Sequence, residues 1–130
     1  MPSDATKDRV ALWLRDAKSD LALASVKKTK SIRYEHLCFH AQQAAEKAVK
    51  AVLLSQGFDV PRTHDLSFLV DLLPLTALPP PSLLLLPVLT KYAVHHRYPG
   101  QDLPVDRRAY LKAIELAQEA VAWARQVLSV

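Results

Sequence analysis

The stretch Cys-Phe-His-Ala-Gln-Gln-Ala-Ala-Glu-Lys-Ala-Val-Lys-Ala, from Cys38 to Ala51, carries two helical patterns at once. Its alanines recur at three- and four-residue steps, which places them on one helix face and lets a second helix pack closely. Polar side chains follow the same spacing on the adjoining surface and form a ladder of hydrogen-bond donors. The alanines are Ala41, Ala44, Ala45, Ala48 and Ala51, and the ladder is His36, His40, Gln43, Lys47 and Lys50.

The remaining sequence also favours helices. The chain has only two glycines, is rich in Ala and Leu, and shows no run of alternating apolar and polar residues. We therefore predict an all-α fold, an up-down bundle of about five helices. At 130 residues, the chain has the length of a single domain spanning residues 1–130.

Capping residues, glycines and prolines set the expected helix limits. In the first helix we expect Asp16 and Asp20 to face outward, and in the second we expect Glu46 to form an ion pair with Lys50. A fourth helix would be kinked or divided at Pro87. The expected helices run from Ser3 or Asp4 to about Lys28, from Ser31 or Ile32 to Gly57, from Thr63 or Asp65 to Leu73, from Ser82 to about His95, and from Asp106 to about Leu128.

Charge and cysteine content limit the possible functions. The net charge of +4 permits an anionic partner, but it is too small to require nucleic acid as a heavily basic tail would. Cys38 is the only cysteine, so an internal disulfide and a multi-cysteine zinc site are excluded, which fits a reducing compartment. We expect the Cys38 thiol to pack as a small hydrophobe, and we predict no metal and no cofactor.

No part of the sequence indicates export or a membrane role. The start, Met-Pro-Ser-Asp, lacks the apolar core that follows a basic segment in a secretory signal, so we predict a cytoplasmic protein. The apolar run from Leu83 to Leu86 ends at Pro87 and is too short to span a bilayer. We interpret this run as part of the core or of an interface.

Three blocks of the sequence resemble the HEPN family, in order and at matching spacing. They are the alanine-rich stretch from Cys38 to Ala51, the helix start Thr63-His64-Asp65-Leu66, and the segment from Tyr92 through Arg97-Tyr98-Pro99. The resemblance implies a five-helix bundle related to the substrate-binding helical domains of nucleotidyltransferases. It also implies a homodimer, encoded beside a minimal nucleotidyltransferase partner in a toxin-antitoxin-like pair.

The family also includes metal-independent ribonucleases, which carry an Arg followed four to six residues later by His. The pattern departs here, because Arg97 follows His95 and His96 and no histidine occurs after it. An Arg-six-residues-His spacing does run from Arg33 to His40, but it lies at the start of the second helix rather than at the expected place.

The candidate residues have the chemistry that phosphate recognition needs. Arg97 can clamp a phosphate while Tyr98 stacks on a base. His95 and His96 could act as acid or base in RNA cleavage, with Arg97 stabilising the phosphorane charge. The candidate catalytic residues are His95, His96 and Arg97, and the candidate ligand-binding residues are Lys47, Lys50, His64, Arg97 and Tyr98.

Each of these residues also has a purely structural interpretation. Tandem histidines at a helix end can interact with its negative dipole, Arg97 can cap carbonyls or pair with Asp102, and His64 can cap a helix or sit at the core edge. We predict a module that binds nucleotide or RNA phosphate. The sequence leaves open two alternatives, a metal-independent ribonuclease and a non-catalytic dimeric protein-interaction module.

Overall fold

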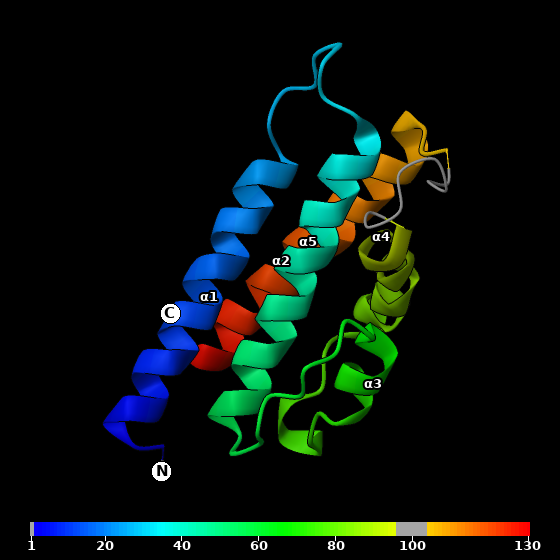
Figure 1. Cartoon of the computed structure of the whole chain (residues 1–130). Coiled ribbons are helices and arrows are strands. Elements are labelled where there is room, and N and C mark those ends of the chain that lie inside the picture. Colours follow the sequence, from blue (N-terminus) through cyan, green and yellow to red (C-terminus); the bar gives the residue numbers. More distant parts are fainter. Residues whose placement is uncertain (1, 96–103) are drawn as a thin grey trace.

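The computed structural model describes residues 2–95 and 104–130, which form five α-helices and two 3-10 helices and contain no strand (Figure 1). The all-α prediction is confirmed. The α-helices are α1 (Asp4–Ala24), α2 (Tyr34–Ser55), α3 (Leu66–Asp71), α4 (Thr90–His95) and α5 (Arg107–Leu128), and the 3-10 helices are η1 (Leu75–Ala77) and η2 (Pro81–Leu89).

Helix α2 lies at the centre of the bundle. It packs along α1 on one side and along α5 on another, while α3, η2 and α4 cover a third side (Figure 1). The alanine face makes this central position possible, because all five of its alanines are fully buried. With no side chain longer than a methyl group on that face, neighbouring helices approach α2 closely. The prediction of a buried small-residue face is confirmed.

Side-chain caps begin three of the helices where the sequence indicated. The Ser3 hydroxyl accepts a hydrogen bond from the Thr6 amide at α1, and Asp65 accepts from the first amides of α3. Asp106 accepts from the Ala109 amide at the start of α5, at 2.8 Å. Each cap satisfies an amide that has no partner within its own helix.

The segment expected to form a fourth helix from Ser82 is instead a 3-10 helix, η2, followed by the short helix α4. Proline has no amide hydrogen and its ring crowds the preceding turn, so Pro87, inside the segment, prevents a regular α-helix there. Helix α1 also ends at Ala24 rather than near Lys28. The Ser25 hydroxyl donates to the Leu21 carbonyl at 2.8 Å, which competes with continuation of the helix.

The outward orientation expected for Asp20 is wrong. Asp16 is exposed, but Asp20 is buried with only 8% of its surface exposed, on the side of α1 that packs against α2.

No described helix combines the length and the apolarity that a membrane-crossing segment requires.

Candidate functional site

The carboxylate of Glu46 is the centre of a buried polar cluster on α2. Its Oε1 accepts hydrogen bonds from the Gln42 amide at 2.9 Å and from His64 Nδ1 at 2.7 Å. Its Oε2 accepts from the Lys50 ammonium at 3.0 Å, which confirms the expected ion pair. Because a carboxylate only accepts hydrogen bonds, the proton in the His64 contact belongs to Nδ1.

Lys50 is held from two sides. Only 5% of its surface is exposed, and its ammonium lies 5.5 Å from the centre of the Trp13 ring of α1. The ring face attracts the cation, while Glu46 neutralises its charge. A buried ammonium requires such partners because its transfer from water is costly. Lys50 therefore joins α1 to α2 and is not an open cation on the surface.

A second buried carboxylate, that of Asp20, joins α1 to α2 at a separate position along α2. Its Oδ2 accepts from the Lys47 ammonium at 2.6 Å, and its Oδ1 lies 3.0 Å from His40 Nδ1. These contacts explain why Asp20 faces inward. Its charge has a cation and an imidazole as partners, and two residues of the predicted donor ladder supply them.

We call this group the polar seam: Asp20, His40, Gln42, Gln43, Glu46, Lys47, Lys50 and His64. Its carboxylate side chains are buried, and its histidine rings are partly exposed to solvent. The side chain of Glu46 is 4% exposed and that of Asp20 is 11% exposed, against 43% for His64 and 33% for His40. A carboxylate bound to Nδ1 fixes the tautomer and the orientation of an imidazole.

Helix α4 starts beside His64. The amide of Leu66, two residues after His64, donates to the Thr90 hydroxyl at 3.1 Å, so the first residues of α3 and α4 lie together. Helix α4 then extends about 8 Å along its axis before it ends at His95. The side chain of His95 and the candidate residues His96, Arg97 and Tyr98 lie outside the described part of the chain.

Cys38 packs as the sequence predicted. It is fully buried where α2 meets α4 and shares a side-chain hydrogen bond with Tyr92. Burial raises the pKa of the Cys38 thiol to about 11 and that of the Tyr92 hydroxyl to about 12. At neutral pH the thiol is therefore protonated and is not a nucleophile.

Among residues 2–95 and 104–130, no three His, Cys, Asp or Glu side chains are grouped closely enough to hold a metal ion.

The all-helical fold agrees with the comparisons to known proteins. The sequence model of the HEPN domain matches residues 10–127. The chain belongs to the HEPN domain family. Its fold is similar to the crystal structure of TT1696 from Thermus thermophilus, with a TM-score of 0.78 and 31% identity over 92% of this chain and 98% of that one.

A second HEPN structure is similar to this chain. ST0689, described as an archaeal HEPN homologue, gives a TM-score of 0.53 and 33% identity over 92% of each chain. No match was found among curated proteins.

Two partners of the donor ladder, Asp20 and Trp13, were not predicted from the sequence. A signal was present, because Trp13, Ala17, Asp20 and Ala24 follow one another at three- and four-residue steps on α1. Asp20 therefore shares a stripe with two fully buried alanines. A charged residue on a buried stripe indicates a polar partner on the facing helix. The donor ladder of α2 could supply that partner for Asp20.

Proposed function

We propose that this HEPN domain binds the phosphate of a nucleotide or of RNA at the side of the bundle where His64 and the end of α4 lie. The observation that carries this proposal is the buried Glu46 carboxylate, which holds His64 by Nδ1 while 43% of the imidazole remains exposed. An imidazole held in this way has a defined orientation. Arg97 and Tyr98 follow α4 in the sequence and would supply the guanidinium and the stacking ring.

Lys47 and Lys50 have a supporting role in this proposal. Each is paired with a carboxylate, so neither offers a full uncompensated charge to a phosphate. Lys47 is the more accessible, with 25% of its side chain exposed against 7% for Lys50. We assign direct phosphate contact to Arg97 and His64. Lys50 positions Glu46, and Lys47, the more exposed of the two, holds Asp20.

We further propose that the physiological context is a toxin-antitoxin-like pair with a minimal nucleotidyltransferase. This part rests on the resemblance of the three sequence blocks to the HEPN family and on family membership over residues 10–127. A bundle that binds nucleotide phosphate beside a nucleotidyltransferase could present the substrate to that enzyme. Co-expression and co-purification of this chain with the product of an adjacent nucleotidyltransferase gene tests the pairing.

Binding of labelled single-stranded RNA in EDTA tests the site itself. We expect Arg97→Ala to weaken binding about tenfold, because a guanidinium-phosphate contact contributes about 1.5–3 kcal/mol. His64→Gln keeps an amide donor for Glu46 but removes the imidazole, so it should weaken binding while the melting temperature stays unchanged. Arg9→Ala changes an exposed arginine of α1 and serves as the matched control.

Gel electrophoresis of the same binding reactions separates RNA binding from RNA cleavage. Cleavage that is lost in Arg97→Ala and in His95→Ala/His96→Ala would favour the ribonuclease alternative, because metal-independent cleavage needs an acid, a base and a cation. Equal affinity of wild type, Arg97→Ala and His64→Gln would contradict the proposed site. The affinity should also fall with salt concentration if phosphate contacts dominate.

One observation favours a second candidate function, that of a dimeric interaction module. Large apolar side chains are exposed along η1 and η2, among them Leu75 at 88% and Leu84 at 65%. Neighbouring Leu85 and Val88 are about half exposed. Exposed apolar side chains gathered on consecutive segments are typical of protein-protein contact. A second copy of this chain is the partner that we propose for this surface.

A further inference from the structure

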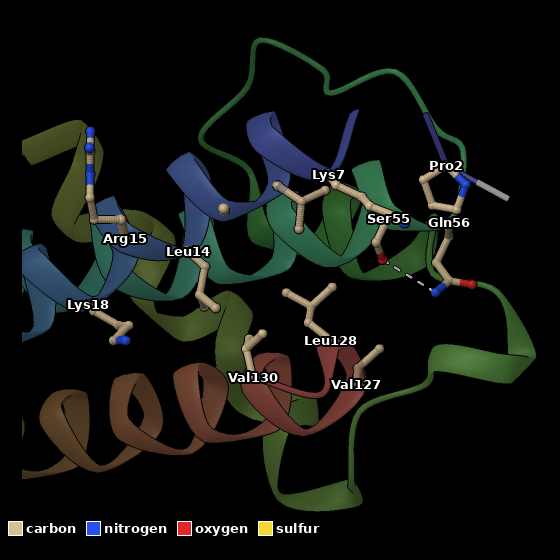
Figure 2. A pocket seen from close by; sticks show the side chains of 12 residues that line it. Pro2, Lys7, Leu14, Arg15, Lys18, Ser55, Gln56, Val127, Leu128 and Val130 are labelled. Atoms are coloured by element: carbon tan, nitrogen blue, oxygen red, sulfur yellow. Dashed lines mark hydrogen bonds between the residues drawn. The ribbon is translucent and has the colours of Figure 1, made fainter. Parts of the chain in front are cut away.

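A groove between α1 and α5 lies apart from the polar seam and has its own chemistry. It encloses about 650 Å³, within the range of small-molecule sites, and lies at the start of α1, the end of α2 and the end of α5 (Figure 2). Its walls are mostly apolar. The residues that line it include Val10, Ala11, Leu14, Val127, Leu128 and Val130.

The bundle leaves this groove open because α1 and α5 meet each other far less than each meets α2. Leu14 of α1 and Leu128 of α5 face one another across the gap (Figure 2). Ala11, which also lines the groove, is exposed and fills little space. The apolar floor therefore remains accessible from solvent.

The charged side chains of the groove are all basic. Lys7, Arg15 and Lys18 line it, and no acidic side chain does. Arg15 has Asp16 at 3.6 Å, and Figure 2 shows its side chain extended away from α5, whereas that of Lys18 turns toward α5. Within residues 2–95 and 104–130, no acidic side chain pairs with Lys18 or Lys7.

The order of residues along α1 gives the groove a polar and an apolar end. Lys18, Leu14 and Val10 follow one another at four-residue steps on one stripe. From Lys18 to Val10 the stripe extends about 12 Å along the helix axis. An elongated ligand with an anionic group at one end would place that group at Lys18. Its apolar part would lie along Leu14 and Val10, against Leu128. A compact anion without a chain would leave the apolar walls in water.

We propose that this groove binds an amphipathic anion, an acyl chain with a terminal carboxylate, with the carboxylate at Lys18 and the chain between α1 and α5. Burial of the acyl chain removes the apolar walls of the groove from water. The Lys18 ammonium forms an ion pair with the ligand carboxylate beside a surface of low polarity. The groove is independent of the proposed phosphate site, because it shares no residue with the polar seam.

Isothermal titration of the purified full chain with dodecanoate below its micellar concentration tests this proposal. We expect saturable binding of one molecule per chain. Dodecyltrimethylammonium, which has an alkyl tail of similar length and the opposite charge, should bind at least about tenfold more weakly because the Lys18 ammonium repels its cation. Acetate, which lacks the chain, should give no binding.

Two variants localise the site. Ala11→Trp fills the groove from an exposed position and should abolish dodecanoate binding, with an unchanged melting temperature as evidence of intact folding. Lys18→Glu should weaken binding about tenfold, as repulsion replaces an ion pair. Lys27→Glu changes an exposed lysine beyond the end of α1 and is the matched control, with unchanged affinity expected.

Several results would overturn the proposal. Absence of binding would do so, as would equal affinity for dodecanoate and dodecyltrimethylammonium, or dodecanoate affinity unchanged in Ala11→Trp. A loss of affinity in Lys7→Glu without a loss in Lys18→Glu would refute the placement of the carboxylate. Self-association that Ala11→Trp abolishes, measured by sedimentation, would identify a second copy of this chain as the occupant instead.

Discussion

Glu46 shows how one residue organises the polar interior of this HEPN domain. A carboxylate with 3% of its surface exposed is stable only when its charge and lone pairs have partners, and Gln42, Lys50 and His64 supply them. The same contacts orient His64. The fold and the candidate site therefore depend on one side chain.

We predict that Glu46→Ala lowers the free energy of unfolding by about 3–5 kcal/mol, because it leaves the buried Lys50 ammonium without its counter-charge. Urea unfolding followed by circular dichroism measures this loss. The double variant Glu46→Leu/Lys50→Met replaces both charges by apolar groups and should recover most of the stability. If Glu46→Ala is as stable as wild type, the Lys50 side chain reaches solvent in that variant and the prediction is wrong.

At the scale of elements, α2 meets α4 through the buried pair Cys38 and Tyr92. Both groups are uncharged in the folded protein, and burial raises both pKa values, to about 11 for Cys38 and about 12 for Tyr92. The ordinary pKa values of these groups are 9.0 and 10.0, so the unfolded chain loses these protons at lower pH than the folded chain does.

We therefore predict that the stability due to this contact is complete below pH 9.0 and is lost as pH rises toward about 12. The variant Cys38→Ala/Tyr92→Phe should show a shallower decline in unfolding free energy over this range. Tyr110, whose pKa burial also raises, contributes in the same direction and remains in the variant. Identical slopes for the two proteins in alkaline urea titrations would contradict the assignment.

At the scale of the molecule, the exposed apolar side chains of η1 and η2 lead to the prediction of a homodimer. We expect Leu84→Glu/Leu85→Glu to shift the chain toward monomer in sedimentation equilibrium, because buried charges without partners oppose association. Both leucines are about half exposed or more, so the fold should persist. Leu12→Glu introduces the same charge at an exposed leucine of α1 and should leave the oligomeric state unchanged.

Much of the architecture follows from local sequence. The caps at Ser3, Asp65 and Asp106 fix where three helices begin, and the alanine periodicity places α2 at the centre. These features depend on residues within a few positions of one another, so spacing and side-chain type are sufficient to predict them. The Glu46 to Lys50 ion pair, at four residues, belongs to the same class.

Only the tertiary structure decided which distant residues share the polar seam and where the bundle remains open. Asp20 is 20 residues from His40 and 27 from Lys47, and His64 is 18 from Glu46. Their meeting depends on how whole helices pack, because each polar group becomes buried only if its partner arrives on another element. The groove between α1 and α5 arises in the same way, since a gap is a property of two packed helices and neither helix specifies it alone.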